Sequence, residues 1–390
     1  MITRLHVRNF KSLKDVEIRL SPLNVFAGPN MSGKSNIIDV LRFLYEVIFP
    51  QAGTNGPHFA LAQRGGIDEV LWKGGDDKLL SILLEGRDFT DPEMQFTYQL
   101  ELLTGIGGYV SIQNESLDVS KNGSPTKLIS REQGNVQLRN IDGKVVGGVP
   151  TEASSLQYAA PNWDGYRFSQ WVKLWRFHHF IPLAMKQPSL MALGQVLSSS
   201  GDNLSAWLMW LQAHSIQSFI RLNEVLHDLF PDVEQVRMIP TPDGKVHLAT
   251  VEKGLKRPTN VWQLSDGFLV MTALLSLIYV PPELSGTQFS VEEPENHLHP
   301  RMLETLVALL RQVRREIQDK QQHLTQLFIT TQSPYLLDQF SIDEIVWVAK
   351  RNGETKVSRP ADKKHLRQLV KDKELGLGEL MYSGVLGEEA

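Results

Sequence analysis

The sequence predicts an α/β fold that combines a mixed central sheet, an antiparallel β-meander and a helical lobe. Three observations predict it. A glycine-containing phosphate-loop motif lies between an apolar strand and a helix near the start of the chain, and a run of short strand-like segments follows. Farther on, an apolar helix precedes a strand that ends in carboxylates. At 390 residues the chain is long enough for more than one domain.

Composition excludes several classes of protein. Hydrophobic residues make up 42% and charged residues 22% of the chain, which is ordinary for a globular protein. The net charge is −4, so no overall basic field favours nucleic acid. The absence of cysteine excludes disulfides and thiolate metal sites. The N-terminus lacks the apolar core of a signal peptide, and no apolar run is long enough to span a membrane. We therefore expect a cytoplasmic protein with no membrane partner.

The first functional motif is Gly28–Ser35, which reads G-P-N-M-S-G-K-S and fits G-x-x-x-x-G-K-[ST]. It follows the apolar run Leu23–Ala27 and precedes a segment, 36–49, with apolar residues at helical spacing. Amides of such a loop and the dipole of the following helix form an anion site. Lys34 would reach the β- and γ-phosphates of a nucleotide, and the Ser35 hydroxyl would ligate Mg²⁺. The residues assigned to nucleotide binding here are Asn30, Met31, Ser32, Gly33, Lys34, Ser35 and Asn36.

The remaining elements of the first half follow from alternation, turn signals and helical spacing. They are an antiparallel pair at Ile2–Val7 and Val16–Leu20, a strand meander from about 79 to 149 with turns at Asn122-Gly123 and Asp142-Gly143, a turn and helix N-cap at Gly201-Asp202-Asn203, an interrupted helix at 204–229 and a strand at Val246–Val251.

The second half begins with a helix at Phe268–Val280 that is apolar on every face and is therefore expected to be buried. A strand at 289–295 that ends in carboxylates, an amphipathic helix at 299–317, a strand and turn at 327–334 and a strand at 344–350 follow. The tail, 350–374, is rich in lysine and arginine. Such a run more often forms a solvated face than a surface for nucleic acid or a partner.

Two further motifs follow the P-loop. Leu264-Ser265-Asp266-Gly267 looks like the signature motif of ABC-type ATPases, in which a serine hydroxyl, a glycine amide and a helix N-terminus can hold a γ-phosphate presented by another subunit. This resemblance implies that Ser265, Asp266 and Gly267 bind nucleotide. An ordinary N-cap is the alternative interpretation. Glu292-Glu293-Pro294-Glu295 is similar to the end of a Walker B strand, which implies that Glu292 lies on the metal side and that Glu293 orients and polarises the attacking water. A charged strand end at the surface is the alternative here.

In this order the motifs resemble the SMC/RecF/OLD-like branch of the ABC-type ATPases, in particular compact bacterial proteins known as AAA family ATPases. The resemblance covers nearly the whole chain and includes four further segments, which are Phe10-Lys11-Ser12-Leu13, Arg64-Gly65-Gly66, Gly201-Asp202-Asn203-Leu204 and 378–384. It implies an ABC-type P-loop ATPase head with ATP and Mg²⁺ as cofactors. In it, Leu264–Gly267 is the signature motif and the strand before Glu292 is the Walker B strand.

The resemblance also identifies Thr330-Thr331-Gln332-Ser333-Pro334 as the switch motif. In the family a histidine that contacts the γ-phosphate usually occupies the place of Gln332. A glutamine amide can donate a hydrogen bond but cannot carry charge. The resemblance therefore does not determine how fast this chain would hydrolyse ATP. The catalytic residues expected are Glu293, Lys34 and Gln332, with Ser35 and Glu292 at the metal. Gln63 and Gln170 are both candidates for the glutamine loop.

The implied organisation has three segments. Residues 1–150 form the N-terminal part of the nucleotide-binding lobe, with the P-loop and the meander. Residues 151–283 form a helical lobe that ends in the signature motif. Residues 284–390 complete the nucleotide-binding lobe with the Walker B and switch motifs and the basic tail. In the family two heads sandwich two ATP molecules, so Ser265 of one chain would face Lys34 of the other in a homodimer or a higher oligomer.

Three roles fit this resemblance. The first is the ATPase subunit of a bacterial anti-phage defence or toxin-type system that controls a separate effector protein. Only 58 residues follow Gln332, too few for the Toprim nuclease that OLD-type relatives carry there, so we expect any nuclease to be another chain. The second is a RecF-like DNA repair or DNA-loading ATPase with DNA as its partner. The third is an ATP-binding scaffold with little turnover. The sequence does not reveal the effector, its trigger or a DNA preference.

Overall fold

The computed structural model describes residues 1–88, 91, 93–121, 123–132, 135–147, 152–280, 286–319, 325–371 and 375–387. The chain divides into two compact units. Unit 1 consists of Met1–Trp175, Thr325–Phe328 and Phe340–Ala390, and unit 2 of Arg176–Leu324 and Ile329–Gln339. The three-segment organisation expected from the sequence remains a prediction.

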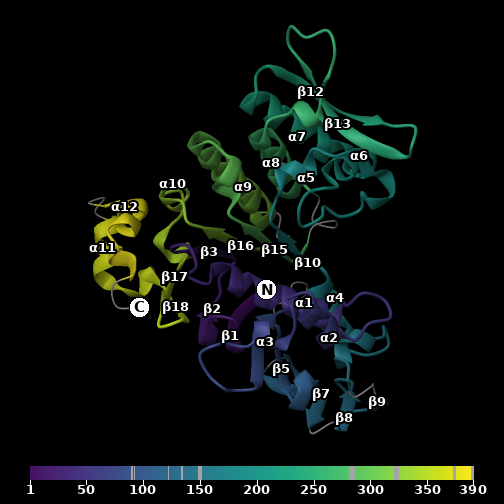
Figure 1. Ribbon diagram of the computed structural model, residues 1–390, viewed down its shortest axis with the longest axis vertical. Helices are drawn as coiled ribbons and strands as arrows, with labels where there is room; N and C mark the ends of the chain where they lie inside the picture. Colours follow the sequence, from purple (N-terminus) through teal and green to yellow (C-terminus); the bar gives the residue numbers. More distant parts are fainter. Residues whose placement is uncertain are drawn as a thin grey trace. The chain divides into compact units, whose positions relative to one another are not determined.

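Unit 1 contains an antiparallel sheet of eight strands in the order β2-β1-β4-β5-β6-β7-β8-β9 (Figure 1). Buried and exposed residues alternate along most of β5, which is typical of a strand with one face on a core. The expected antiparallel pair and meander are confirmed, and the turn at Gly143 joins the last two strands, whereas Asn122 lies outside the described residues. The strands are β1 (Ile2–Phe10), β2 (Leu13–Arg19), β4 (Leu79–Arg87), β5 (Met94–Thr104), β6 (Val110–Lys121), β7 (Ser124–Glu132), β8 (Asn135–Arg139) and β9 (Val145–Gly147).

A second group of strands in unit 1 carries the P-loop. All five residues of β3 (Leu23–Ala27) are buried, and β3 runs parallel to β17 (Ile345–Arg351), which pairs antiparallel with β18 (Glu354–Ser358). Helix α1 (Lys34–Ile48) follows β3 and buries its apolar face, as the spacing of its residues predicts. The expected strand–loop–helix order is confirmed, and the helix begins two residues before position 36.

Short helices complete unit 1. They are α2 (Gly56–Ala62), α3 (Ile67–Val70), α4 (Tyr166–Lys173), α11 (Lys364–Lys371) and α12 (Leu377–Tyr382), with 3₁₀ turns at Ile106–Gly108, Ser155–Tyr158, Ile342–Glu344, Pro360–Asp362 and Val385–Gly387. Helix α11 lies in the basic tail and buries Leu366. Residues 372–374 of that tail lie outside the described residues.

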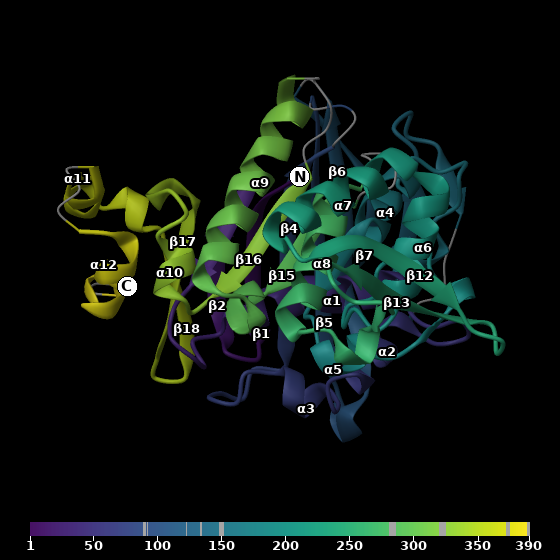
Figure 2. The same ribbon diagram turned by 90° about the horizontal axis from the view of Figure 1, so that it is seen from above.

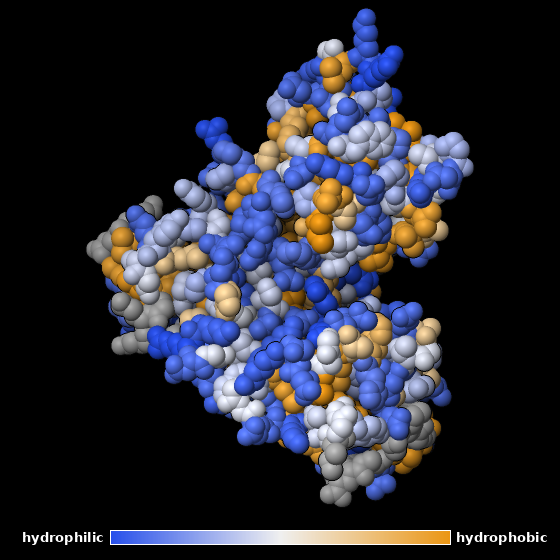
Figure 3. Space-filling view, viewed as in Figure 1, coloured by the Kyte–Doolittle hydropathy of each residue, from blue (hydrophilic) through white to orange (hydrophobic). Residues whose placement is uncertain are grey.

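Unit 2 is rich in helices. Helix α8 buries nine consecutive residues, Phe268 to Ser276, so the expectation of a helix buried on every face is confirmed. The expected interrupted helix is two helices, α6 and α7, which meet at Ser215, whose φ of −148° is not helical. The exposed face of α9, which runs unbroken in Figure 2, is hydrophilic in Figure 3. The helices are α5 (Pro182–Met185), α6 (Leu204–His214), α7 (Ile216–Leu229), α8 (Asp266–Ile278), α9 (Pro300–Asp319) and α10 (Pro334–Leu337), with 3₁₀ turns at Met191–Leu193, Val261–Gln263 and Pro294–His297.

Asn203 requires a correction. It stands at the N-cap position of α6, as expected, but its side chain makes no capping hydrogen bond. Its amide instead donates to the carbonyl oxygens of Leu193 and Val196, and its Oδ1 accepts from the Ser198 amide. The asparagine therefore holds the preceding loop rather than the helix end.

The strands of unit 2 form two groups. In the first, β13 lies between β11 and β12 and also pairs with β14. In the second, β15 lies between β10 and the end of β16. The strands are β10 (Trp175–His178), β11 (Ser189–Leu190), β12 (Val233–Pro240), β13 (Lys245–Glu252), β14 (Thr259–Asn260), β15 (Gln288–Glu292) and β16 (Gln326–Thr331), of which β10 and β16 are each divided by residue between the two units.

The described part of the chain contains no helix that is both long enough and apolar enough to cross a membrane.

Candidate functional site

The loop between β3 and α1 needs glycine at two places. The φ of Gly28 is +159° and that of Gly33 is +106°. A Cβ on Gly28 would lie 2.0 Å from the carbonyl oxygen of Val348, and a Cβ on Gly33 would lie 2.0 Å from Oγ1 of Thr355. Side chains at these positions would therefore collide with β17 and β18. Between them, Met31 adopts a left-handed φ of 62° and exposes 84% of its surface.

Lys34 and the start of α1 form a cationic end to this loop. The Lys34 side chain is buried, and its Nζ donates to the carbonyl oxygens of Gly28 and Pro29, both at 2.9 Å. No side chain caps α1, and Ser35 is exposed in its first turn. The Ser32 hydroxyl is buried without a hydrogen-bond partner in the part of the chain that the structure describes. An ammonium, an uncapped helix N-terminus and free hydroxyls fit a phosphate chain with Mg²⁺.

Residues far apart in the sequence support the loop from below. Thr355 donates to the Ser32 carbonyl oxygen at 2.9 Å, and its hydroxyl lies 2.6 Å from that of Ser12. The Asn36 side-chain amide donates to the Ser12 hydroxyl at 2.7 Å. The side-chain amide of Asn36 is thus hydrogen-bonded within the protein. A contact between Asn36 and nucleotide, as expected from the sequence, stays a prediction that rests on the position of Asn36 in the first turn of α1. No local sequence pattern indicates a role for Ser12 or Thr355 at the P-loop.

An ion network fixes the outer face of α1. Asp39 accepts Lys11 Nζ at 2.6 Å and Arg64 Nη2 at 2.7 Å, while Arg64 also reaches Glu46. Burial works to raise the pKa of Asp39, but the two cations outweigh it and hold that pKa below its usual value. Burial raises the pKa of Glu46 more than the guanidinium lowers it. This network explains why Phe10–Leu13 and Arg64–Gly66 accompany the P-loop, since both segments anchor the helix that follows it.

The carboxylate motif lies in unit 2 at the end of β15. Glu293 has a left-handed backbone, with φ 45° and ψ 56°, which costs a non-glycine residue roughly 1–3 kcal/mol. Its amide donates to the carbonyl oxygen of Thr330 at 3.0 Å, and its Oε2 accepts from Asn296 Nδ2 at 3.0 Å. Glu292 and Glu293 are both partly exposed. The turn thus holds two carboxylates at the strand end with Glu293 fixed by its own amide and oxygen.

The switch motif meets the carboxylate motif through Glu295. Oε1 of Glu295 accepts from the Thr331 hydroxyl at 2.6 Å and from the Gln332 amide at 3.0 Å. Burial, foremost, raises the pKa of Glu295. The structure therefore brings Gln332 beside the acidic turn, and Glu295, which the sequence reasoning quoted without a role, is the residue that connects them.

The predicted signature motif begins α8 in unit 2. Ser265 is its N-cap and accepts a hydrogen bond from the Phe268 amide at 3.2 Å, so the capping interpretation is correct in geometry. A Cβ on Gly267 would lie 2.8 Å from the carbonyl oxygen of His297, which requires glycine where α8 meets the turn after Glu293. Asp266 pairs with the lysine at the end of α5 at 2.6 Å.

The predicted site residues fall into two sets. Those from Asn30 to Asn36 lie in unit 1, and Ser265–Gly267, Glu292, Glu293 and Gln332 lie in unit 2. Among the described residues, no three His, Cys, Asp or Glu side chains are arranged to hold a metal ion. Mg²⁺ in nucleotide sites typically uses only one or two protein oxygens with phosphates and water, so Ser35 and Glu292 remain predicted metal ligands. The glutamine-loop candidates Gln63, at the end of α2, and Gln170, in α4, lie in unit 1.

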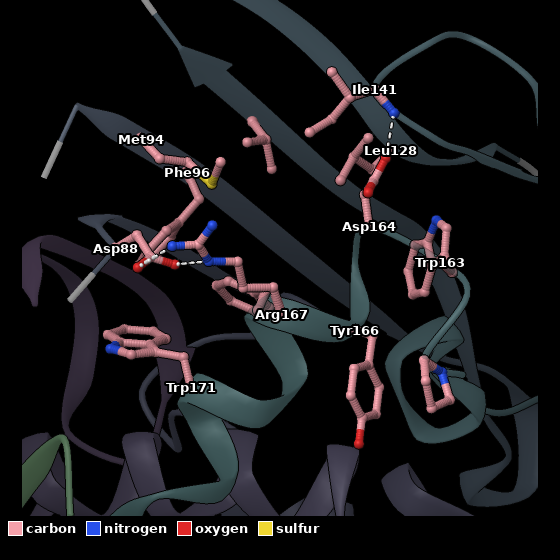
Figure 4. A pocket seen from close by; sticks show the side chains of 13 residues that line it. Asp88, Met94, Phe96, Leu128, Ile141, Trp163, Asp164, Tyr166, Arg167 and Trp171 are labelled. Carbon is pink, nitrogen blue, oxygen red and sulfur yellow. Dashed lines mark hydrogen bonds and ion pairs between the residues drawn. The ribbon is translucent and has the colours of Figure 1, made fainter. Parts of the chain in front are cut away.

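A cavity of about 220 Å³ in unit 1 includes none of the predicted residues (Figure 4). Aromatic side chains from β5 and α4 line it, and Arg167 closes on Asp88 with two nitrogens at 2.6 and 2.8 Å. Because the charged pair is mutually satisfied, it offers no unmatched charge to a ligand.

Two family models match the chain. Residues 161–338 match the family described as "AAA domain, putative AbiEii toxin, Type IV TA system", and residues 1–130 match "AAA ATPase domain". A stretch of 50 residues is 36% identical to an OLD nuclease of Thermus scotoductus. That match spans 13% of this chain and 10% of the nuclease, so the chain aligns with only a small part of that protein.

Solved structures of similar fold are heads of Smc proteins. The SmcHead bound to the C-winged helix domain of ScpA is 17% identical with a TM-score of 0.56, over 92% of this chain and 96% of that one. The Smc head with an extended coiled coil bound to the C-terminal domain of ScpA, from Pyrococcus furiosus, is 16% identical with a TM-score of 0.53, over 95% and 99%. The Smc head with a coiled coil and joint from Pyrococcus yayanosii is 11% identical with a TM-score of 0.51, again over 95% and 99%. At these identities the likeness establishes the fold.

Proposed function

Because this chain is an ABC-type ATPase of the SMC/RecF/OLD-like kind, we propose that it binds ATP with Mg²⁺ and hydrolyses it as an ATP-driven dimer switch. The observation that carries the proposal is the P-loop, where the buried Lys34 ammonium and the uncapped start of α1 face the same loop. Mg²⁺ would neutralise phosphate charge beside Ser35 and Glu292.

Glu293 is the proposed general base. Water attacks the γ-phosphorus, Glu293 takes the water proton, and the bond from the γ-phosphorus to the bridging oxygen of ADP breaks. Two features support this role. The strained backbone at Glu293 is a feature that clusters at active sites, and Asn296 orients its carboxylate. The side-chain amide of Gln332 would donate a hydrogen bond to the γ-phosphate.

The dimer switch follows from the signature motif. Ser265 and Gly267 of one protomer would contact the γ-phosphate held by Lys34 of its partner. ATP would then favour the closed dimer through a contact that ADP cannot make, and hydrolysis would loosen it. The test is light scattering of the Glu293→Gln variant with and without ATP. A dimer that forms only with ATP supports the switch; a constant mass in both conditions contradicts it.

The effector assignment has its own support. The description of the family model over residues 161–338 refers to a toxin of a type IV toxin–antitoxin system, which favours the ATPase subunit of a defence or toxin-type system over a RecF-like DNA ATPase. Duplex-DNA binding at about 0.15 M salt separates the two, because phosphate-driven affinity is strongly salt-dependent. Stable association with a separate protein supports the first role, and tight duplex binding by the purified chain alone supports the second.

A further inference from the structure

Glu295 is the centre of a hydrogen-bonded chain that ends at the predicted switch residue. The Ser333 amide donates to the Thr331 hydroxyl at 2.9 Å, the Thr331 hydroxyl donates to Glu295 Oε1 at 2.6 Å, and the Gln332 amide donates to the same oxygen at 3.0 Å. Charge-assisted hydrogen bonds of this kind are about twice as strong as neutral ones. One carboxylate oxygen therefore fixes three consecutive residues of the turn.

Packing alone does not account for a carboxylate here. Oε2 of Glu295 is buried and has no hydrogen-bond partner within the described ranges. Burial of a carboxylate with one unmatched oxygen is unfavourable, and burial raises the pKa of Glu295. An apolar side chain would fill the same space without that cost. What the carboxylate adds is the pair of hydrogen bonds from Thr331 and Gln332.

The same turn also fixes Glu293. Its amide donates to both the carbonyl oxygen and the hydroxyl of Thr330, at 3.0 and 3.2 Å. Two sets of hydrogen bonds thus join the end of β15 to the end of β16, one at Glu293 and one at Glu295. Together they set the position of the Gln332 turn relative to the Glu293 carboxylate. Without Glu295 the Gln332 turn would lose its own hydrogen bonds to the acidic turn, and it would be held less directly, by the Glu293 set and the pairing of β15 with β16.

We propose that Glu295 is a positioning residue that holds Gln332 in register with Glu293 for ATP hydrolysis, a role that rests on the proposed function. It would act on hydrolysis through the switch turn, by its hydrogen bonds to Thr331 and Gln332. Misplacement of a catalytic group by about 1 Å can cost about 100-fold in rate. The role therefore predicts an effect on kcat with ATP affinity preserved.

Steady-state kinetics test the role. Glu295→Leu should lower kcat about 10- to 100-fold and leave the Kd for ATP within about threefold. Glu295→Gln, whose amide oxygen can still accept both hydrogen bonds, should retain most of the activity, and Thr331→Val should lie between. Glu304→Leu, which removes an exposed carboxylate from α9, is the matched control and should behave as wild type. In a Gln332→Ala background Glu295→Leu should add little, because the residue it positions is already gone.

Hydrogen exchange tests the same contacts without requiring activity. In Glu295→Leu the amides of Gln332 and Ser333 should exchange at least tenfold faster than in wild type, and in Glu295→Gln they should not. Unchanged exchange in Glu295→Leu, or losses in kcat that multiply with Gln332→Ala, would overturn the positioning role. If Glu295→Leu does not fold, Thr331→Val gives both measurements. If the wild-type chain does not hydrolyse ATP but the variants show the expected exchange pattern, the proposed function is contradicted. The hydrogen bonds from Glu295 to the switch turn are then still supported.

Discussion

The Asp39 carboxylate pairs with two cations. At the scale of side chains, it shows which contacts can be predicted from the sequence and which cannot. Lys11 and Arg64 belong to segments that the sequence analysis connected with the P-loop, but nothing in their spacing indicates that both reach Asp39. Glu293, by contrast, could be singled out because the four acidic-motif residues are contiguous. Glu295 was visible in the same motif, but its partners lie 36 and 37 residues away, so its role required the structure.

The Asp39 network predicts a pH-dependent stability. The pKa of Asp39 is lowered in the folded state, so the unfolded chain binds a proton at higher pH than the folded one does. The contribution is therefore present above the ordinary value of 3.8 and is lost as pH falls through the lowered pKa. Asp39→Asn should cost about 2 kcal/mol at neutral pH and flatten the acid limb of stability. Urea denaturation from about pH 3 to pH 7 measures both.

Glu46→Gln is the control for that series. Burial raises the pKa of Glu46, so its ionisation opposes folding above its unfolded pKa. Glu46→Gln should therefore change the pH dependence of the free energy of unfolding in the direction opposite to the change in Asp39→Asn. An acid limb in Asp39→Asn as steep as that of wild type would show that the ion network does not hold the Asp39 charge.

At the scale of elements, local sequence patterns predicted those helices and strands that have the same apolar surroundings on every side. β3 and α8 are buried on all sides, so their sequences are apolar throughout and were recognised. Strand β12 was missed because its two buried valines, Val233 and Val236, are three residues apart, and a register shift between Val233 and Gln235 breaks the alternation. The break between α6 and α7 carries no glycine or proline and depends on the backbone at Ser215.

Ser265 allows the capping and signature interpretations to be separated. Ser265→Ala removes the cap of α8 and should cost about 1 kcal/mol in stability, whereas Ser265→Asp keeps a capping oxygen and should cost little. If the hydroxyl contacts a γ-phosphate, both variants should lose hydrolysis, since aspartate repels the phosphate. Thermal unfolding and ATPase assays on the two proteins give the answer. Hydrolysis by Ser265→Asp at the wild-type rate would contradict the signature interpretation and would mean that Ser265 acts only as the N-cap of α8.

At the scale of the whole molecule, the P-loop depends on contacts that no local pattern could reveal. Ser12 and Thr355 are separated by 343 residues and meet beneath the loop. The motif order and the family resemblance predicted the fold class, which the family models and the Smc heads confirm. The composition of the nucleotide site remains a proposal, because its expected residues are distributed between unit 1 and unit 2.

The proposed dimer makes a prediction about mixtures. Lys34→Ala and Ser265→Ala should each be inactive alone. A mixed dimer has one site with both defects and one site with an intact P-loop and an intact signature serine, so mixing should restore hydrolysis. ATPase activity of equimolar mixtures, compared with each variant at the same total concentration, measures this. Failure of the mixture to exceed either variant would mean that the two motifs do not come from different protomers.

The most direct test of the central claim is steady-state ATP hydrolysis by the purified chain beside Lys34→Ala and Glu293→Gln. We expect turnover in the wild type, loss of nucleotide binding in Lys34→Ala, and in Glu293→Gln a rate about 10²–10⁴-fold lower with ATP binding retained. Hydrolysis by Glu293→Gln at the wild-type rate would contradict the assignment of the general base, and equal turnover in all three proteins would contradict ATP hydrolysis at the P-loop.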